Sequence, residues 1–157
     1  MNNIIIKAIL VYFSFFFSVV SKSTKEIEIT AASMEWNKKE SVAIAIGEAK
    51  AIKGNSILYA NKIVVFFNKK KDVETINKLD ASGNVKFIRE DQIATGDNAI
   101  YYVDKENILM KGNVTLQRED SIMLGDELSI DLKTSSSKLT SKKNEKVRVK
   151  YNSEKIE

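Results

Sequence analysis

The chain has 157 residues, 43% of them hydrophobic, a formal net charge of +4, and no cysteine, histidine or proline. This length is enough for one domain with a sizeable core. The missing cysteine excludes disulfide bonds, and the missing histidine removes the usual general base near neutral pH. Without either residue the chain lacks the usual ligands of zinc, copper and iron and the usual activated nucleophiles, so we expect no catalytic site, no cofactor and no metal site.

An apolar segment opens the chain. Lys7 is followed by the apolar run Ala8–Val20 and then by the small residues Ser21 and Ser23. A basic start, an apolar centre and a small-residue exit are typical of a secretory signal peptide, which we predict over residues 1–23. The alternative is a retained membrane anchor, although the run is shorter than the roughly 20 residues that span a bilayer.

After this segment, apolar residues recur with period two rather than with helical spacing. The pattern predicts roughly ten or more short antiparallel strands and no long helix, in one β domain over residues 24–141. The remaining residues, 142–157, are rich in lysine and arginine, and the alternation of Val147, Val149 and Tyr151 predicts one last strand there. Such a basic tail suits phosphorylated lipids or a membrane surface, and is equally consistent with a solvated terminus.

Three segments that begin at Gly47, Gly83 and Gly112 repeat one pattern. Position +10 is always isoleucine, position +13 is small, and position +14 is asparagine or aspartate. In chain order these residues are Ile57, Ile93 and Ile122; Ala60, Gly96 and Gly125; and Asn61, Asp97 and Asp126. A unit this short must stack on its neighbours to bury its apolar face. The small residue followed by an acid or amide predicts a bend within a strand, and hence a folded-over sheet.

Turns recur at one offset in the repeat. They are Lys53-Gly54-Asn55, Arg89-Glu90-Asp91 and Arg118-Glu119-Asp120. Acidic pairs such as Glu90 and Asp91 could in isolation be general acids and bases or calcium ligands, but the repeated offset favours hairpin turns. The glycines form no phosphate-binding motif.

Within the strands of each repeat, every second residue is apolar, which predicts a sheet with one sheltered face. From this parity we expect nine residues to face inward: Val85, Phe87, Ile93, Tyr101, Val114, Leu116, Ile122, Leu128 and Ile130. The pattern is consistent both with a closed core and with a groove that shelters acyl chains. Unpaired edge strands would favour head-to-tail assembly by strand addition.

The phrases SGNVKF, KGNVTLQRED, ATGDNAIYYV and MLGDELSIDL resemble the OstA-like family of lipopolysaccharide-transport proteins over about residues 27–139. The resemblance implies an all-β fold, an open β-jellyroll (β-taco) of stacked antiparallel strands with internal repeats. It also implies a periplasmic lipopolysaccharide-binding bridge that carries lipopolysaccharide from the inner to the outer membrane during outer-membrane assembly, without enzymatic chemistry.

On this resemblance the nine inward residues are candidate contacts for the lipid A acyl chains. The implied partners are further copies joined head to tail, an inner-membrane transport complex and an outer-membrane translocon, with no nucleic acid. Two alternatives stay open: the inner-membrane-anchored partner C of the same system, and a structural periplasmic β-protein with a closed core.

Overall fold

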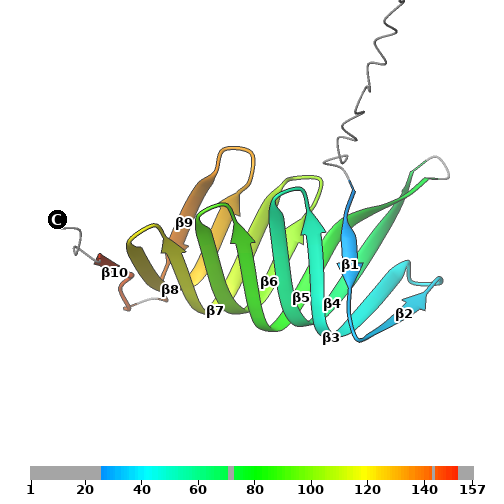
Figure 1. Ribbon diagram of the computed structural model, residues 1–157, viewed down its shortest axis with the longest axis horizontal. Helices are drawn as coiled ribbons and strands as arrows, with labels where there is room; N and C mark the ends of the chain where they lie inside the picture. The colour runs from blue at the N-terminus through cyan, green and yellow to red at the C-terminus, as the bar shows by residue number, and fades with distance from the viewer. Residues whose placement is uncertain (1–25, 71–72, 143, 152–157) are drawn as a thin grey trace, which may run out of the picture.

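The computed structural model describes residues 26–70, 73–142 and 144–151, and every regular element in this part of the chain is a β-strand (Figure 1). The strands are β1 (Glu28–Thr30), β2 (Ser33–Asn37), β3 (Val42–Lys53), β4 (Ser56–Lys70), β5 (Val73–Arg89), β6 (Gln92–Tyr102), β7 (Asn107–Arg118), β8 (Ser121–Asp131), β9 (Ser136–Thr140) and β10 (Arg148–Tyr151). The predicted signal peptide lies outside the described residues. Across these residues no helix has the length and apolarity to cross a membrane.

All pairings are antiparallel and belong to one sheet with the order β1-β3-β4-β5-β6-β7-β8-β10. β2 pairs with the first half of β3, whereas β1 pairs with its second half. At the other end, β9 and β10 likewise pair with opposite halves of β8. Figure 1 shows β1 and β2 at one end of the stack and β9 and β10 at the other, so the sheet is open. The open all-β jellyroll and the last strand after residue 141 are confirmed.

The sequence pattern predicted short strands, and this prediction is wrong for the central strands. Strands β3 to β8 run for 11 to 17 residues. Each contains a bend, and pairing continues on both sides of it. The bends divide the sheet into two half-sheets. Half-sheet A contains residues 42–46, 62–70, 73–82, 98–102, 107–111 and 127–131, and half-sheet B contains residues 49–53, 56–60, 85–89, 92–96, 114–118 and 121–125.

The strands bend at the predicted small–acid pairs, but the bulges themselves lie opposite these pairs, at the repeat glycines of the neighbouring strands. Gly112 and Asn113 of β7 have φ values of +81° and +48°, and together they lie opposite the single residue Asp126 of β8. On the other side of β7, the Asn113 Nδ2 donates to Asp97 Oδ2 at 2.8 Å. An extra residue in one strand bends and twists the pair locally. Because the bulges recur at one offset, the bends align along the lower side of Figure 1 and fold the sheet lengthwise.

The predicted hairpin turns are confirmed. The first residue of each two-residue turn has positive φ: Gly54 at +59°, Glu90 at +52° and Glu119 at +45°. These turns lie along one rim of half-sheet B, and the turns after β6 and β8 lie along the rim of half-sheet A. We call the space between the two rims the mouth. It lies opposite the bends, on the upper side of Figure 1.

Candidate functional site

The candidate site is the apolar interior between the half-sheets. Cross-strand register places its side chains in three rows that run along the whole stack. The row of half-sheet B is Ile29, Ala51, Leu58, Phe87, Ala94, Leu116, Met123 and Val149. The rows of half-sheet A are Met34, Ala45, Ile63, Ala81, Ala99, Met110, Leu128 and Leu139, and Trp36, Ala43, Val65, Leu79, Tyr101, Ile108, Ile130 and Ser137.

The central members of these rows are packed. Phe87, Leu116 and Leu128 are at most 2% exposed, and residues of both half-sheets form one hydrophobic cluster. Burial of each such side chain contributes about 1.5–3 kcal/mol to folding. Large residues often lie beside alanine in the neighbouring strand, as Phe87 does beside Ala94. The interior is therefore a filled apolar layer that runs along the stack.

Seven of the nine predicted inward residues lie in this interior: Val85, Phe87, Tyr101, Val114, Leu116, Leu128 and Ile130. The inward placement of Ile93 and Ile122 is wrong. In β6 the buried residues Gln92 and Ala94 flank Ile93, and Ile122 is 41% exposed.

The physical reason for the error is a change of face at the bend. Before Asp97 the inward residues of β6 have even numbers, and after it they have odd numbers. The same change occurs at Asn61 in β4 and Asp126 in β8, because one residue there opposes a two-residue bulge. Ile93 therefore joins an outward row that continues through Ile88 and Ile57 to Ile52. If the odd-numbered residues of such a strand face inward on one side of the bend, the even-numbered residues face inward on the other side.

Polar contacts close the mouth above the apolar rows. Arg89 Nη1, on the rim of half-sheet B, donates at 2.7 Å to the carbonyl of Leu132, which lies in the turn after β8 on the rim of half-sheet A. Lys53 Nζ lies 3.6 Å from Glu106 Oε1 across the same mouth, and 5.8 Å from the ring centroid of Tyr101. Burial raises the pKa of the Tyr101 phenol, and the charge of Lys53 partly opposes this shift. The two half-sheets are thus linked by side chains that can separate without breaking strand pairing.

Both ends of the interior are uncovered. At one end Met34 and Trp36 of β2 are 50% and 53% exposed, although they align with buried residues of β3. At the other end Val149 and Tyr151 of β10 are 46% and 77% exposed, on the inward face of half-sheet B. Apart from the row that ends in Ser137, the rows therefore end in apolar side chains that a further β-strand could cover.

The sequence pattern did not assign the end residues or the rim cations to the site. It also missed inward residues of half-sheet A such as Leu79 and Met110. Extending the inward parity of Phe87 and Leu116 along β5 and β7, which keep it through the bulge, would have found both residues. The rim cations Lys53, Arg89 and Arg118 share one repeat offset, but that offset alone marks a turn.

Comparison with known proteins supports this architecture. A family model described as "LptA/(LptD N-terminal domain) LPS transport protein" matches residues 28–136. The chain is 36% identical over 63 residues to the LPS-assembly protein LptD of Nitrosomonas europaea, a match that covers 40% of this chain and 9% of that protein. An uncharacterised protein of Rhizobium meliloti, R00383, is 27% identical over 119 residues, which cover 72% of this chain and 64% of the relative. The chain therefore spans less than two thirds of these curated relatives.

Among solved structures, LptH of Pseudomonas aeruginosa superposes with a TM-score of 0.71, over 82% of this chain and 96% of that one. It is described as the LptA homologous periplasmic component of the lipopolysaccharide transport device. At 14% identity this likeness shows the fold alone. The family match covers most of the chain, and so the protein belongs to the LptA/(LptD N-terminal domain) family of lipopolysaccharide transport proteins.

Proposed function

We propose that this protein is a periplasmic bridge that binds lipopolysaccharide and carries it from the inner to the outer membrane. The observation that carries the proposal is the set of three apolar rows, which run without interruption between two uncovered ends. Each methylene that leaves water gains about 0.8 kcal/mol, so such an interior would stabilise acyl chains during an aqueous crossing. The inward side chains consist almost entirely of hydrocarbon, which favours sliding of the acyl chains along the interior over tight binding at one position.

Because the inward side chains are already packed, lipid must enter by separation of the half-sheets. The bends act as a hinge line in this proposal, and the contacts of Arg89 and Lys53 across the mouth are the ones that open. Strand pairing within each half-sheet is retained during opening. No covalent step is required, which agrees with a carrier rather than an enzyme.

Assembly of copies end to end supports the bridging role. β8 pairs antiparallel with both β9 and β10, and β3 pairs antiparallel with both β1 and β2. The β1–β2 edge of a second copy can therefore follow the β9–β10 edge with the alternation of strand direction preserved. In such a joint Val149 would lie in line with Ile29 of the second copy, and Leu139 in line with its Met34. The same edges would serve the inner-membrane complex and the outer-membrane translocon.

Site-specific photo-crosslinking in living cells tests the proposal. A crosslinker at Phe87 or Leu116 should capture lipopolysaccharide, because both side chains lie in the interior. The matched control is Ile88, which is adjacent to Phe87 and points to the opposite face of β5. Absence of lipopolysaccharide at both inward positions, or equal capture at Ile88, would contradict the proposal and favour the closed structural core, which the dense packing also allows.

A further inference from the structure

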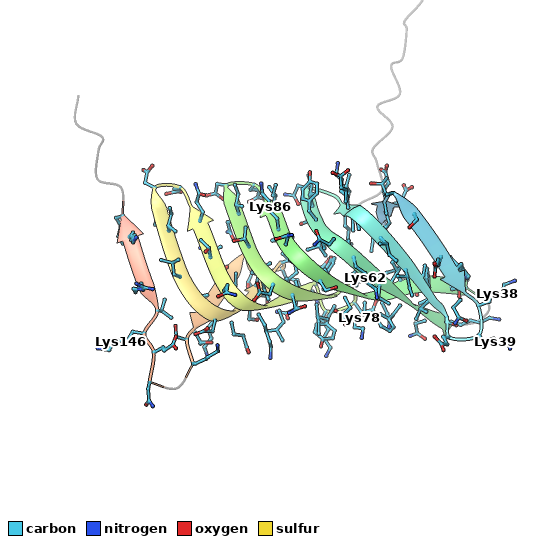
Figure 2. The ribbon with its side chains drawn as sticks, turned by 90° about the horizontal axis from the view of Figure 1, so that it is seen from below. Lys38, Lys39, Lys62, Lys78, Lys86 and Lys146 are labelled. Atoms are coloured by element: carbon cyan, nitrogen blue, oxygen red, sulfur yellow. The ribbon has the colours of Figure 1, made fainter. Side chains whose placement is uncertain are left out.

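The outward positions of the strands at the two open ends carry opposite charges. At one end, the outward residues of β1 and β2 include two carboxylates and no cation: Glu28, Thr30, Ser33, Glu35 and Asn37. At the other end, the outward residues of β9 and β10 include three cations and no carboxylate: Ser136, Lys138, Thr140, Arg148 and Lys150. All of these residues are exposed, so each end presents its own sign of charge to a neighbouring molecule. Lys38 and Lys39 follow in the turn beyond β2 (Figure 2).

These charged side chains point away from the apolar interior. In β2, Glu35 precedes Trp36, which aligns with a buried alanine of β3. In β9, Lys138 precedes Leu139, which aligns with a buried leucine of β8. Successive residues of a strand point to opposite faces of the sheet, so the charges lie on the outer surface and leave the apolar rows uninterrupted.

The end-to-end joint in which the apolar rows continue also fixes which outward residues meet. On half-sheet A, Lys138 of one copy lies directly opposite Glu35 of the second copy. On half-sheet B, Lys150 lies directly opposite Glu28 of the second copy. Opposite charges at directly opposed positions of an antiparallel pair stabilise the pairing. The joint therefore gains one ion pair on each half-sheet.

A slipped joint on half-sheet A loses this match. A shift by two residues is the smallest that keeps every side chain on its own face of the sheet. Such a shift would place Lys138 opposite Ser33 or Asn37, which are uncharged. The pair of Lys138 with Glu35 therefore favours the register in which the interior is continuous.

Joints between two like ends would bring like charges together. A two-fold axis through the line of bends can also join two β1–β2 edges with antiparallel strands, and half-sheet A of one copy then adjoins half-sheet B of the other. In that joint Glu35 of β2 would face the strand that carries Glu28. In the corresponding joint of two β9–β10 edges, Lys138 would face the strand that carries Arg148 and Lys150. Like charges on directly paired strands are destabilising, so both of these joints are disfavoured.

We propose that these outward charges set the polarity and the register with which a second copy joins the stack. Lys138 and Lys150 of one copy pair with Glu35 and Glu28 of the next. The inference rests on the end-to-end joint of the proposed function, and it adds the residues that select this joint over like-end and slipped joints. Apolar side chains occur at both ends and cannot by themselves distinguish one end from the other. Exposed ion pairs are screened by salt, so the selection is strongest at low ionic strength.

Charge reversal tests the pairing, with the association of the full chain measured by sedimentation equilibrium at low ionic strength. Lys138→Glu and Glu35→Lys should each weaken association about tenfold, because each turns an attractive pair into a repulsive one. A double variant that carries both changes should associate like the parent, since every joint again has opposite charges. An equimolar mixture of the two single variants should associate more tightly than either variant alone.

Lys86→Glu is the matched control. It makes the same change of charge as Lys138→Glu at an exposed position of β5, in the middle of the stack (Figure 2). Because this residue is distant from both ends of the strand order, the control should associate like the parent. Circular dichroism verifies that each variant is folded.

A disulfide assay reads the polarity and the register directly. The chain contains no cysteine, so one engineered thiol in each copy is unique. In the proposed joint, Thr140 of one copy lies opposite Ser33 of the next. A mixture of Thr140→Cys and Ser33→Cys copies should therefore form a mixed disulfide-linked dimer, and neither variant should form a linked dimer on its own.

The outcomes separate this inference from the proposed function. Equal weakening by Lys138→Glu and Lys86→Glu, or a double variant as weak as the single variants, would overturn the charge pairing, since only net charge would then act. If the mixed disulfide still forms in that case, the end-to-end joint of the proposed function stands. Linked dimers of Ser33→Cys copies alone would overturn the polarity. If the parent neither associates nor forms the mixed disulfide, the joint fails, and the bridging role fails with it.

Discussion

Replacement of Gly112 by alanine tests whether the bends are held by close packing as well as by backbone conformation. Gly112 has φ of +81°, a conformation that costs an L-residue about 1 kcal/mol relative to glycine. An alanine Cβ would also lie 3.0 Å from Asp97 Cβ and Cγ and still closer to its Oδ2. Asp97 cannot retreat freely, because Asn113 Nδ2 binds its carboxylate at 2.8 Å. Overpacking of this kind costs about 1–3 kcal/mol, so we expect a total loss of about 2–4 kcal/mol.

Gly54→Ala provides the matched control. Gly54 also has positive φ, at +59°, but no atom lies within 4 Å of the position of an added Cβ. This variant should therefore lose only the conformational part, about 1 kcal/mol. Urea unfolding followed by far-ultraviolet circular dichroism gives both values, with an unchanged m-value as the condition for comparing midpoints. A loss for Gly112→Ala no larger than that for Gly54→Ala would refute the argument that Asp97 packs against the bend.

Two further predictions concern the mouth and the open end. The raised pKa of Tyr101 keeps its phenol protonated in the folded state after the unfolded chain has lost that proton, so this group stabilises less as pH rises above about 10. Tyr101→Phe should therefore lose less stability than the parent as the pH rises above about 10 in urea titrations; identical pH profiles would contradict the buried phenol. Val149→Asp places a charge on the inward face of β10, and it should abolish the concentration-dependent mass increase that we expect of the parent in sedimentation equilibrium. Lys86→Asp, at an exposed position of β5, is the control, and association that survives Val149→Asp would exclude the end-to-end joint.

Much of the fold follows from local chemistry that is visible in the sequence. The glycines at positions 47, 83 and 112 adopt positive φ, and the turn at Gly54 lies where the repeat offset predicts it. Alternation of apolar and polar residues predicts strands, and repetition of that alternation predicts a stack. These features could be predicted because each depends on a few neighbouring residues.

The candidate site was less predictable, because it depends on how the bends rotate the chain. Phe87 and Leu116 each follow a bulge on a strand that keeps its parity, and both were correctly placed inside. Ile93 and Ile122 lie on strands that change parity, and both were placed on the wrong face. A one-residue difference in length between paired strands reverses the face of the sheet to which every later side chain points. No single residue marks this reversal in the sequence.

By itself, the sequence determined that this protein is a stack of antiparallel strands with one apolar face, without cysteine or histidine, the usual ligands of zinc, copper and iron. Only the tertiary structure decided which residues form that face, since register across the bulges sets it. It also brought Lys53 of β3, Arg89 of β5 and Glu106 of the turn before β7 to one mouth. These groups are distant along the chain, and the fold of the sheet along its bends is what sets their separation.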